Sequence, residues 1–214
     1  MVQSVNSVNQ VSDNSISREI NESPVSFLFD RRGQRKYLTV VERRLWLRAA
    51  QKMPLRSRLF LQTLAYSGAR ISEVLSLVPV SFDESEGVVI VECLKKRSRG
   101  IYRAIPLPGT LVKEVMALTA PDGTPLLAEQ RIWNCSRTTA WKWVKQAMAL
   151  AKLAGPKASP KGLRHSFGVN SLRSSPITLV KKWLGHSRLS TTEIYVGAIG
   201  PEEREIAARI WKDF

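Results

Sequence analysis

The chain has 214 residues, of which 43% are hydrophobic and 24% charged, a composition that can bury a sizeable core. Its 33 Lys and Arg outnumber its 18 Asp and Glu, and the net charge of +15 makes polyanions its natural partners, nucleic acid first. No apolar run reaches the roughly 18 residues of a membrane span. The first residues do not resemble a signal peptide, and two cysteines, Cys93 and Cys135, argue against a disulfide framework or a structural zinc site. We therefore expect a cytoplasmic protein in a reducing compartment that contains DNA.

Residues 1–36 are rich in Ser, Asn and Gln and show neither helical nor strand periodicity, so we interpret them as a flexible N-terminal arm. Residues 37–214 are interpreted as one folded domain. Between Glu129 and Glu193 this domain has twelve Lys or Arg and no acidic residue. Because a solvated surface normally mixes charge signs, this stretch is typical of a surface that meets phosphates.

Three helices are predicted first, over residues 39–53, 55–66 and 71–77. Thr39 and Glu42 have the spacing of a capping box, and Pro54 is expected to stop the helix that they open. Gly68 suits a left-handed C-cap at the end of the second helix.

A β-hairpin is predicted next, with strands near residues 88–91 and 101–107 and a basic tip at 95–100. The remaining helices are expected at 109–119, 137–153, 161–173, 176–184, 190–198 and 201–212. Ser190 and Glu193 have the spacing of a second capping box, which would place Tyr195 in the second turn of its helix. The predicted fold class is α+β, mainly α with one small antiparallel β-sheet.

Four separated segments carry residues suited to phosphate chemistry, and each alone has an ordinary structural explanation. They are Gly68-Ala-Arg-Ile-Ser-Glu-Val74, the basic tip of the hairpin, Pro160-Lys-Gly-Leu-Arg-His165, and the stretch from Leu184-Gly-His186 to Tyr195. An arginine near a helix start is usually a surface or capping residue, and a charged turn is the commonest kind of loop. A lone tyrosine in an amphipathic helix usually belongs to the core or its rim.

Together these segments resemble the active site of the tyrosine recombinases, the phage-type integrases. The order is Arg, Lys, Lys-x-x-Arg, His, and then Tyr nine residues after the histidine. LGHSRLSTTEIY is similar to the family's nucleophile motif, and GARISEVLSL and GLRHSF resemble its two arginine motifs. The resemblance covers residues 37–212. It implies the fold of the family's catalytic domain and a site-specific recombinase that cleaves and rejoins DNA through a covalent 3′-phosphotyrosyl link.

The resemblance assigns roles to four residues around the scissile phosphate. Arg70 and Arg164 would hold its two nonbridging oxygens, and His186 would donate a hydrogen bond to it. Tyr195 would attack phosphorus. Arginine forks match the geometry of a phosphate and stay charged, whereas a phenol must lose its proton as it attacks.

Three further residues take roles by the same resemblance. Lys95 would donate a proton to the departing 5′ oxygen, with Lys96 as the neighbouring alternative. Lys161 stands where many members have histidine and some have lysine, and only its positive charge can be assigned. Glu73 would brace the site from behind. Because these cations can supply what metal ions give other phosphoryl-transfer sites, and the covalent link conserves bond energy, we expect no metal and no cofactor.

The residues expected to contact the DNA backbone lie in two places, the hairpin tip and a helix opened by Ser136. They are Lys96, Arg97, Arg99, Arg137, Lys142 and Lys145.

The resemblance also implies the partners. These are double-stranded DNA with an inverted-repeat recombination site and further copies of the chain, a homo-tetramer on DNA that forms from monomers or weak dimers. The arm is too short for the core-binding domain that most members carry, so we expect a short, resolvase-like member that consists of the catalytic domain. The tail, residues 200–214, either docks on a neighbouring protomer or packs on its own domain. Two other functions stay open, a non-catalytic helical DNA-binding protein and a relaxing enzyme like the type IB topoisomerases.

Overall fold

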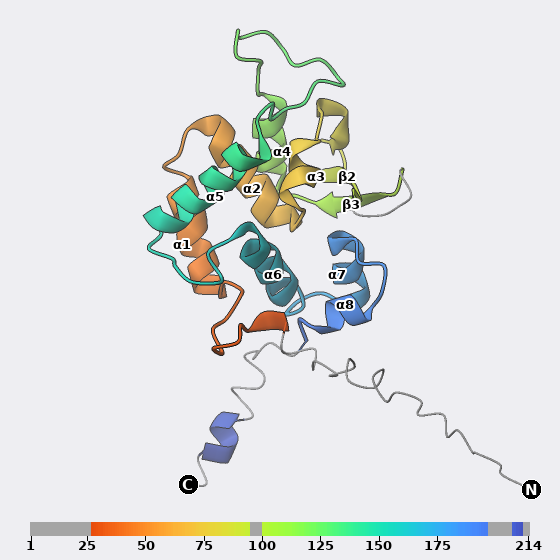
Figure 1. The fold of residues 1–214 in the computed structure, drawn as a ribbon. Helices are drawn as coiled ribbons and strands as arrows, with labels where there is room; N and C mark the ends of the chain where they lie inside the picture. Colours follow the sequence, from red (N-terminus) through yellow and green to blue (C-terminus); the bar gives the residue numbers. More distant parts are fainter. Residues whose placement is uncertain (1–26, 95–99, 197–206, 212–214) are drawn as a thin grey trace, which may run out of the picture.

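The computed structural model describes residues 27–94, 100–196 and 207–211 (Figure 1). The described part is mainly helical, with one three-stranded antiparallel sheet of order β1-β2-β3, which confirms the predicted fold class. The strands are β1 (Phe82–Asp83), β2 (Val88–Glu92) and β3 (Tyr102–Pro106). The helices are α1 (Val40–Ala50), α2 (Leu55–Ser67), α3 (Ile71–Leu75), α4 (Gly109–Met116), α5 (Arg137–Leu150), α6 (Pro160–Ser171), α7 (Ile177–Leu184) and α8 (Ser190–Glu193), with a 3-10 turn, η2 (Pro79–Ser81).

Helix α1 begins with the predicted capping box. The Thr39 hydroxyl accepts a hydrogen bond from the Glu42 amide, and the Glu42 carboxylate accepts one from the Thr39 amide at 2.8 Å. The helix was predicted to end at Met53, but it ends at Ala50. Proline disfavours a helical residue before it, so the chain leaves the helix one turn ahead of Pro54.

Gly68 ends α2 in the left-handed conformation, as predicted, with φ of 62°. A side chain there would also strike Phe167, since an added Cβ atom would lie 2.4 Å from its ring. Two separate constraints therefore favour glycine at position 68, the left-handed backbone conformation and the close approach of Phe167 on α6. Helix α3 follows at once and is shorter than predicted, ending at Leu75.

The hairpin of β2 and β3 forms where it was predicted, and buried and less buried side chains alternate along both strands. Val89 pairs with Ile105 and Val91 with Arg103, and all four side chains face inward and are buried. Strand β1 was not predicted, because two residues are too few to give a sequence period. The hairpin tip, residues 95–99, lies outside the described residues.

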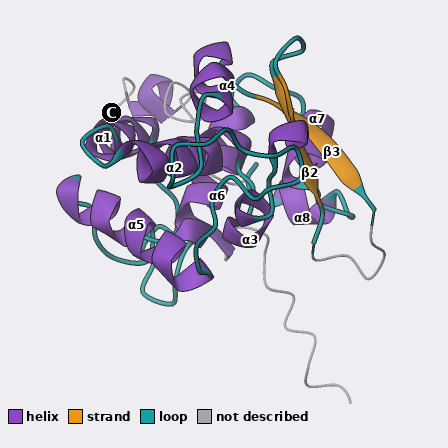
Figure 2. Ribbon diagram, turned by 90° about the horizontal axis from the view of Figure 1, so that it is seen from above, coloured by secondary structure: helices purple, strands orange, loops and turns teal. Residues whose placement is uncertain are grey.

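Two hydrophobic clusters make up the interior. The larger joins α1 to α5 and the sheet, with Trp46, Phe60 and Trp133 completely buried or nearly so. The smaller lies between α6, α7 and the segment after α8, and its buried members are Leu28, Tyr37, Phe167, Val180, Leu184 and Tyr195. Figure 2 shows the sheet at one side of the helical body, with α7 next to β3.

The described structure starts at Phe27, within the stretch that the sequence analysis interpreted as an arm ending at residue 36. Leu28 is 0% exposed and its carbonyl accepts the Lys36 amide. Between them the Asp30 carboxylate accepts the amides of Arg32 and Gln34, which closes a tight turn. The sequence analysis did not predict this turn, because a single buried residue, Leu28, in a polar segment produces no helical or strand periodicity.

The C-terminal helices were located correctly, but most were predicted too long. The second capping box was wrong. Leu189, and not Ser190, precedes α8, and it has the helical angles φ −64° and ψ −39°, with no side-chain cap. A capping side chain needs an extended backbone to reach back to the amides, so Ser190 cannot act as one. Tyr195 consequently lies in the turn after α8.

Residues 207–211 form a short helical segment within the predicted range 201–212. Residues 201–206 and 212 lie outside the described residues. No helix in the described ranges is long and apolar enough to cross a membrane.

Candidate active site

The first part of the site is the start of α3. Glu73 is 0% exposed, and its carboxylate accepts three hydrogen bonds, from the Arg70 amide and guanidinium at 2.8 Å each and from Arg103 at 2.7 Å. Burial alone would raise the pKa of Glu73, but Arg103 and Arg70 hold it below its ordinary value. Glu73 therefore remains a carboxylate and fixes Arg70, whose side chain is 33% exposed and can meet a ligand.

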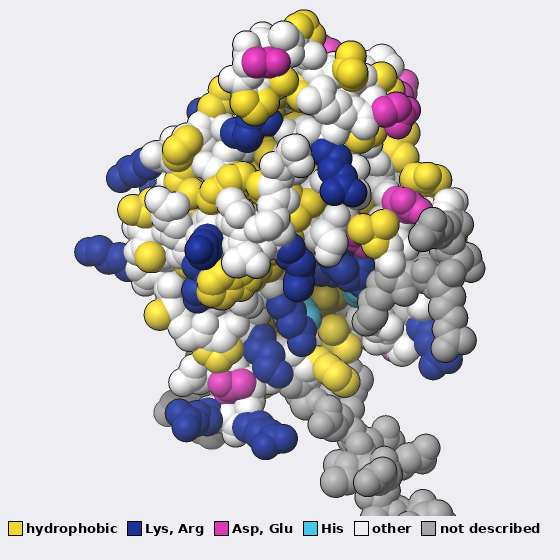
Figure 3. All heavy atoms as spheres, turned by 45° about the horizontal axis from the view of Figure 1, so that its top comes forward, with side chains coloured by type: hydrophobic (Ala, Val, Ile, Leu, Met, Phe, Trp, Pro, Cys, Tyr) yellow, Lys and Arg dark blue, Asp and Glu magenta, His cyan; other side chains and the backbone are white. Residues whose placement is uncertain are grey.

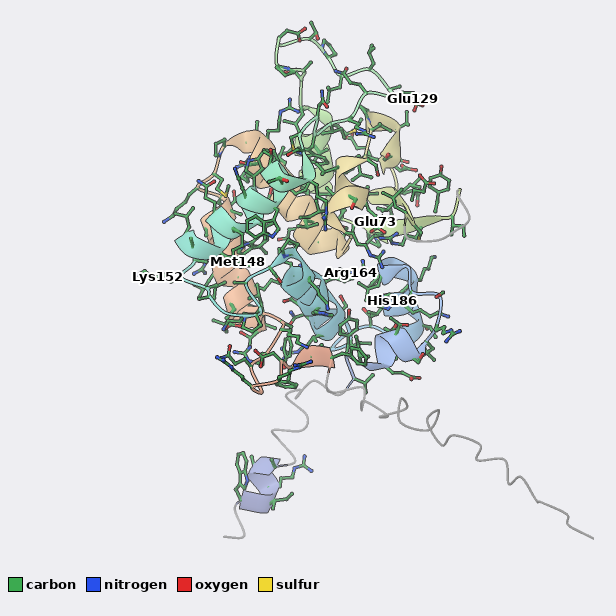
Figure 4. All side chains as sticks on the ribbon, viewed as in Figure 1. Glu73, Glu129, Met148, Lys152, Arg164 and His186 are labelled. Atoms are coloured by element: carbon green, nitrogen blue, oxygen red, sulfur yellow. The ribbon has the colours of Figure 1, made fainter. Side chains whose placement is uncertain are left out.

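Arg164 projects from α6 into the junction between the two hydrophobic clusters. Its guanidinium donates to the carbonyl of Gly68 at 2.7 Å and to the carbonyl of Leu184 at 2.5 Å. Burial, and then the charge of Arg70, lowers its pKa to about 10, which leaves it protonated at neutral pH. Figure 4 labels Glu73, Arg164 and His186, which lie close together between α6, α7 and the sheet.

His186 follows the left-handed glycine that ends α7, Gly185. Its Nδ1 atom lies 2.9 Å from the Thr192 hydroxyl, and its ring stacks on Tyr195 at 6.2 Å between centroids and 19° between planes. Burial, followed by the charge of Arg164, lowers the pKa of His186 to about 3. The imidazole is therefore neutral at neutral pH.

Tyr195 is 3% exposed and sits against α6. Its ring covers Gly168, where an added Cβ atom would lie 2.6 Å from the ring carbons. Its hydroxyl lies 3.2 Å from Nδ1 of His165. Burial raises the pKa of the phenol, and the charges of Arg164 and Arg70 oppose that rise.

Two residues of this arrangement were missed by the sequence analysis. Arg103 occupies an inward-facing position of β3, and this break in an apolar alternation was the available signal. Its guanidinium joins Glu73 to the Trp183 carbonyl at 2.7 Å, and so ties α3 to α7. His165 stands beside Arg164 in GLRHSF, and only its three-dimensional contact with Tyr195 reveals it.

The structure brings together Arg70, Glu73, Arg164, His186 and Tyr195, which come from three of the four predicted segments. Lys161 is exposed at the start of α6 and lines a pocket there that also includes His165. In Figure 3 the dark-blue Lys and Arg side chains gather on one face, with histidine atoms visible among them.

Lys95, Lys96, Arg97 and Arg99 lie outside the described residues. Of the residues expected to contact DNA from α5, Arg137 and Lys142 are exposed. Lys145 instead donates to the Ala158 carbonyl at 2.9 Å, and it lies over the Trp141 ring.

This arrangement can place an anionic phosphodiester beside a phenol. Arg70, Arg164 and His186 offer donors around the position of Tyr195, and the burial of the phenol strengthens electrostatic interactions at that position. Within the described ranges, no three His, Cys, Asp or Glu side chains are grouped as they would be around a metal ion.

Comparison with known proteins agrees with this geometry. Residues 36–199 match the phage integrase family. The chain belongs to that family. A relative in it, the tyrosine recombinase XerA of Pyrococcus furiosus, is 31% identical over 181 residues, which are 81% of this chain and 61% of the relative. The chain spans less than two thirds of the curated relatives it matches, since the corresponding share is 47% for XerD of Xanthomonas campestris.

Solved structures of the phage integrase family share the fold. The crystal structure of XerH bound to a palindromic difH substrate superposes with a TM-score of 0.66 and 24% identity, over 83% of this chain and 53% of that one. The catalytic domain of bacteriophage HP1 integrase gives a TM-score of 0.59 and 19% identity, over 81% of this chain and 93% of that domain. The described helices and sheet therefore form the catalytic-domain fold of the family.

Proposed function

We propose that this chain is a site-specific tyrosine recombinase, which cleaves and rejoins double-stranded DNA through a covalent link to Tyr195. The single observation that carries the proposal is the environment of the Tyr195 ring. It stacks on His186 and feels the charges of Arg164 and Arg70, so a phosphate bound by these groups lies beside a phenol.

The reaction follows from the charge that develops. As the Tyr195 oxygen bonds to phosphorus, the nonbridging oxygens gain negative charge, which Arg70 and Arg164 stabilise as fixed cations. Neutral His186 donates a hydrogen bond to the same group, provided that its Nε2 atom carries the proton while Nδ1 accepts from Thr192. The departing 5′ oxygen takes a proton from Lys95, or from Lys96 if that side chain is the acid. Rejoining reverses these steps and needs no ATP.

The chemical nature of the partner is supported by charge and by relatives. The net charge of +15 favours a polyanion, and XerH is described bound to a palindromic recombination substrate. We propose that this chain likewise binds an inverted-repeat site and acts there as a tetramer. The tail, residues 200–214, would then dock on the neighbouring protomer.

A covalent-capture experiment tests the proposal. Nicked duplexes with randomised inverted repeats are incubated with the protein, and adducts that resist SDS are isolated, sequenced and mapped to the linked residue. The nick lets the cleaved end diffuse away, so the adduct accumulates. We expect the link at Tyr195 and none with Tyr195→Phe, which should bind the recovered duplex as the wild type does.

The same duplex separates the alternatives. A relaxing enzyme would form the adduct on single sites and remove supercoils without pairing two sites. A non-catalytic DNA-binding protein would give no adduct with any duplex. A 5′-bridging phosphorothiolate, whose leaving group needs no proton, should rescue the variant of whichever lysine is the acid, Lys95→Ala or Lys96→Ala.

A further inference from the structure

The Tyr195 hydroxyl has one hydrogen-bond partner among the described residues, and that partner is a histidine to which no role has been assigned so far. Nδ1 of His165 lies 3.2 Å from the hydroxyl oxygen, and the two rings meet edge to face at 5.7 Å between centroids. His165 and Gly168 are three residues apart on α6, so they lie on one face of the helix. On that face the Tyr195 ring packs against Gly168, and the Tyr195 hydroxyl lies within hydrogen-bond distance of His165.

We propose that His165 is a catalytic base, which holds the Tyr195 hydroxyl and accepts its proton as the oxygen attacks phosphorus. This inference rests on the proposed recombinase function. The O–H bond of Tyr195 breaks as the bond from its oxygen to phosphorus forms, and the proton moves to Nδ1 of His165. The bond from phosphorus to the 5′ oxygen breaks, and that oxygen is protonated by the hairpin lysine. In rejoining, His165 returns the proton to the departing phenolate.

The protonation state of His165 suits this role. Burial lowers its pKa to about 4, assisted by the nearby charges of Lys161, Arg164 and Lys36. At neutral pH the imidazole is therefore neutral, with a lone pair to offer. If Nδ1 accepts from the phenol, the ring proton sits on Nε2, which is buried and has no hydrogen-bond partner in the described structure.

The residue at position 161 cannot take the same role. A lysine ammonium has three donors and no lone pair, so Lys161 can hold a phosphate but cannot accept a proton from a phenol. His165 lies one helical turn further along α6. Both residues line a pocket of about 220 Å³, together with Lys36, Pro156, Ser159 and Gly162.

DNA binding should strengthen the base when it is needed. The cations that disfavour an imidazolium at position 165 are the same ones that meet a phosphate, chiefly Lys161 and Arg164. A bound phosphate offsets their charge, so His165 gains proton affinity in the complex that reacts. The titratable and charged groups that face it are Lys36 before α1, Lys161 and Arg164 on α6, His186 after α7, and Tyr195 after α8.

The test measures single-turnover adduct formation across pH on the nicked duplex recovered by covalent capture. His165→Asn keeps an amide oxygen near the position of Nδ1, so it can accept the hydroxyl but cannot be protonated. We expect adduct formation to slow at least about 100-fold at pH 7, with unchanged DNA affinity. The rate of the variant should keep rising with pH where the wild type levels off, because hydroxide must replace the base.

A second arm distinguishes a base from a structural contact. Replacing Tyr195 with 3,5-difluorotyrosine gives a more acidic phenol that has less need of a base. It should accelerate the His165→Asn protein much more than the wild type. A His165→Asn protein with the wild-type rate and pH profile would overturn the inference, and so would a slow variant that the fluorinated phenol does not rescue.

Nitrogen NMR of the wild-type protein provides a test that does not depend on variants folding. The free protein should show His165 with an unprotonated Nδ1 and a protonated Nε2. The opposite tautomer in free protein would contradict the inference. If the wild type forms no adduct with any duplex, the proposed function itself fails and the inference with it, whereas normal adducts from His165→Asn reject only the inference.

Discussion

Glu73 and Arg103 form an ion pair of 2.7 Å in which the side chains are only 0% and 3% exposed. The pair lies behind Arg70 and is connected through Arg103 to the end of α7. Because neither charge has access to water, each depends on the other, and the site behind the proposed phosphate position depends on both.

Removing one member of this pair should destabilise the fold strongly. Arg103→Met leaves the Glu73 carboxylate buried with one cation fewer, and we expect a loss of about 3–5 kcal/mol in the free energy of unfolding. Urea denaturation measures it. Glu114→Gln is the matched control, since it breaks an ion pair with Arg58 that lies at the surface. The side chains of Arg58 and Glu114 are 26% and 47% exposed, so the loss should be at most about 1 kcal/mol. Equal losses in the two variants would contradict the assignment.

Arg70 and Arg164, which are both proposed to serve cleavage, should differ in their contribution to stability. Arg164→Ala leaves the Gly68 and Leu184 carbonyls without their donor, at a cost of about 2–4 kcal/mol, whereas Arg70→Ala should cost about 1 kcal/mol because Glu73 keeps Arg103. Each variant should raise the cleavage barrier by about 2–4 kcal/mol. Urea unfolding and single-turnover cleavage at saturating DNA measure the two effects. A cleavage rate within a few-fold of wild type for either variant would reject its role.

The two histidines should make the fold sensitive to mild acid. Their pKa values are lowered to about 4 for His165 and about 3 for His186, so between pH 6.5 and those values the unfolded chain binds more protons than the folded one. Stability should therefore fall as pH falls from 7 to 5, by about 1–2 kcal/mol for each histidine. Thermal unfolding across this range measures it.

The pH effect has an internal control, because these are the only two histidines in the chain. The pKa of Glu42 is lowered to about 2, so its contribution to stability is lost only below the ordinary glutamate pKa of about 4.3. A protein with both His165→Asn and His186→Asn should have a nearly constant stability between pH 7 and 5. A slope as steep as that of the wild type would show that other groups are responsible.

Gly168→Ala should displace the nucleophile without unfolding the protein. The new methyl group would lie 2.6 Å from the Tyr195 ring, so the ring must move away from His165. Alanine favours the helix by about 1 kcal/mol, which offsets part of the overlap. We expect adduct formation to fall at least about ten-fold, as overlap of this size must misplace the attacking oxygen. Gly109→Ala, with open space around the new atom, should cleave at the wild-type rate.

The basic residues of α5 should fall into two groups in a salt titration of DNA binding. Exposed Arg137 and Lys142 are free to neutralise phosphates, and each replaced by Ala should reduce the log–log salt slope by about 0.9. Lys145 donates to the Ala158 carbonyl, so Lys145→Met should leave the slope unchanged and lower stability by about 1 kcal/mol. An unchanged slope for all three variants would remove α5 from the DNA interface.

Local signals in the sequence predicted what depends on neighbours along the chain. Thr39 with Glu42, and Gly68 after α2, mark helix ends because their contacts span at most three or four residues. The site residues were predicted from the order of their motifs. The contacts that fix them were not foreseen, because Arg164 meets a carbonyl 96 residues away and Arg103 meets a carboxylate 30 residues away. No periodicity records such pairs. The same holds for His165, whose partner is 30 residues distant.

The burial of Tyr195 limits what this strongly basic protein can do to the DNA that it contacts non-specifically. A chain with a charge of +15 is expected to associate with almost any duplex and to travel along it in search of a target. During that search the hydroxyl stays covered, because the residue is only 3% exposed and rests between α6 and the His186 ring. On the proposed function, passing contacts should therefore leave the strands intact, because attack requires a phosphate held by Arg70 and Arg164 next to the Tyr195 ring.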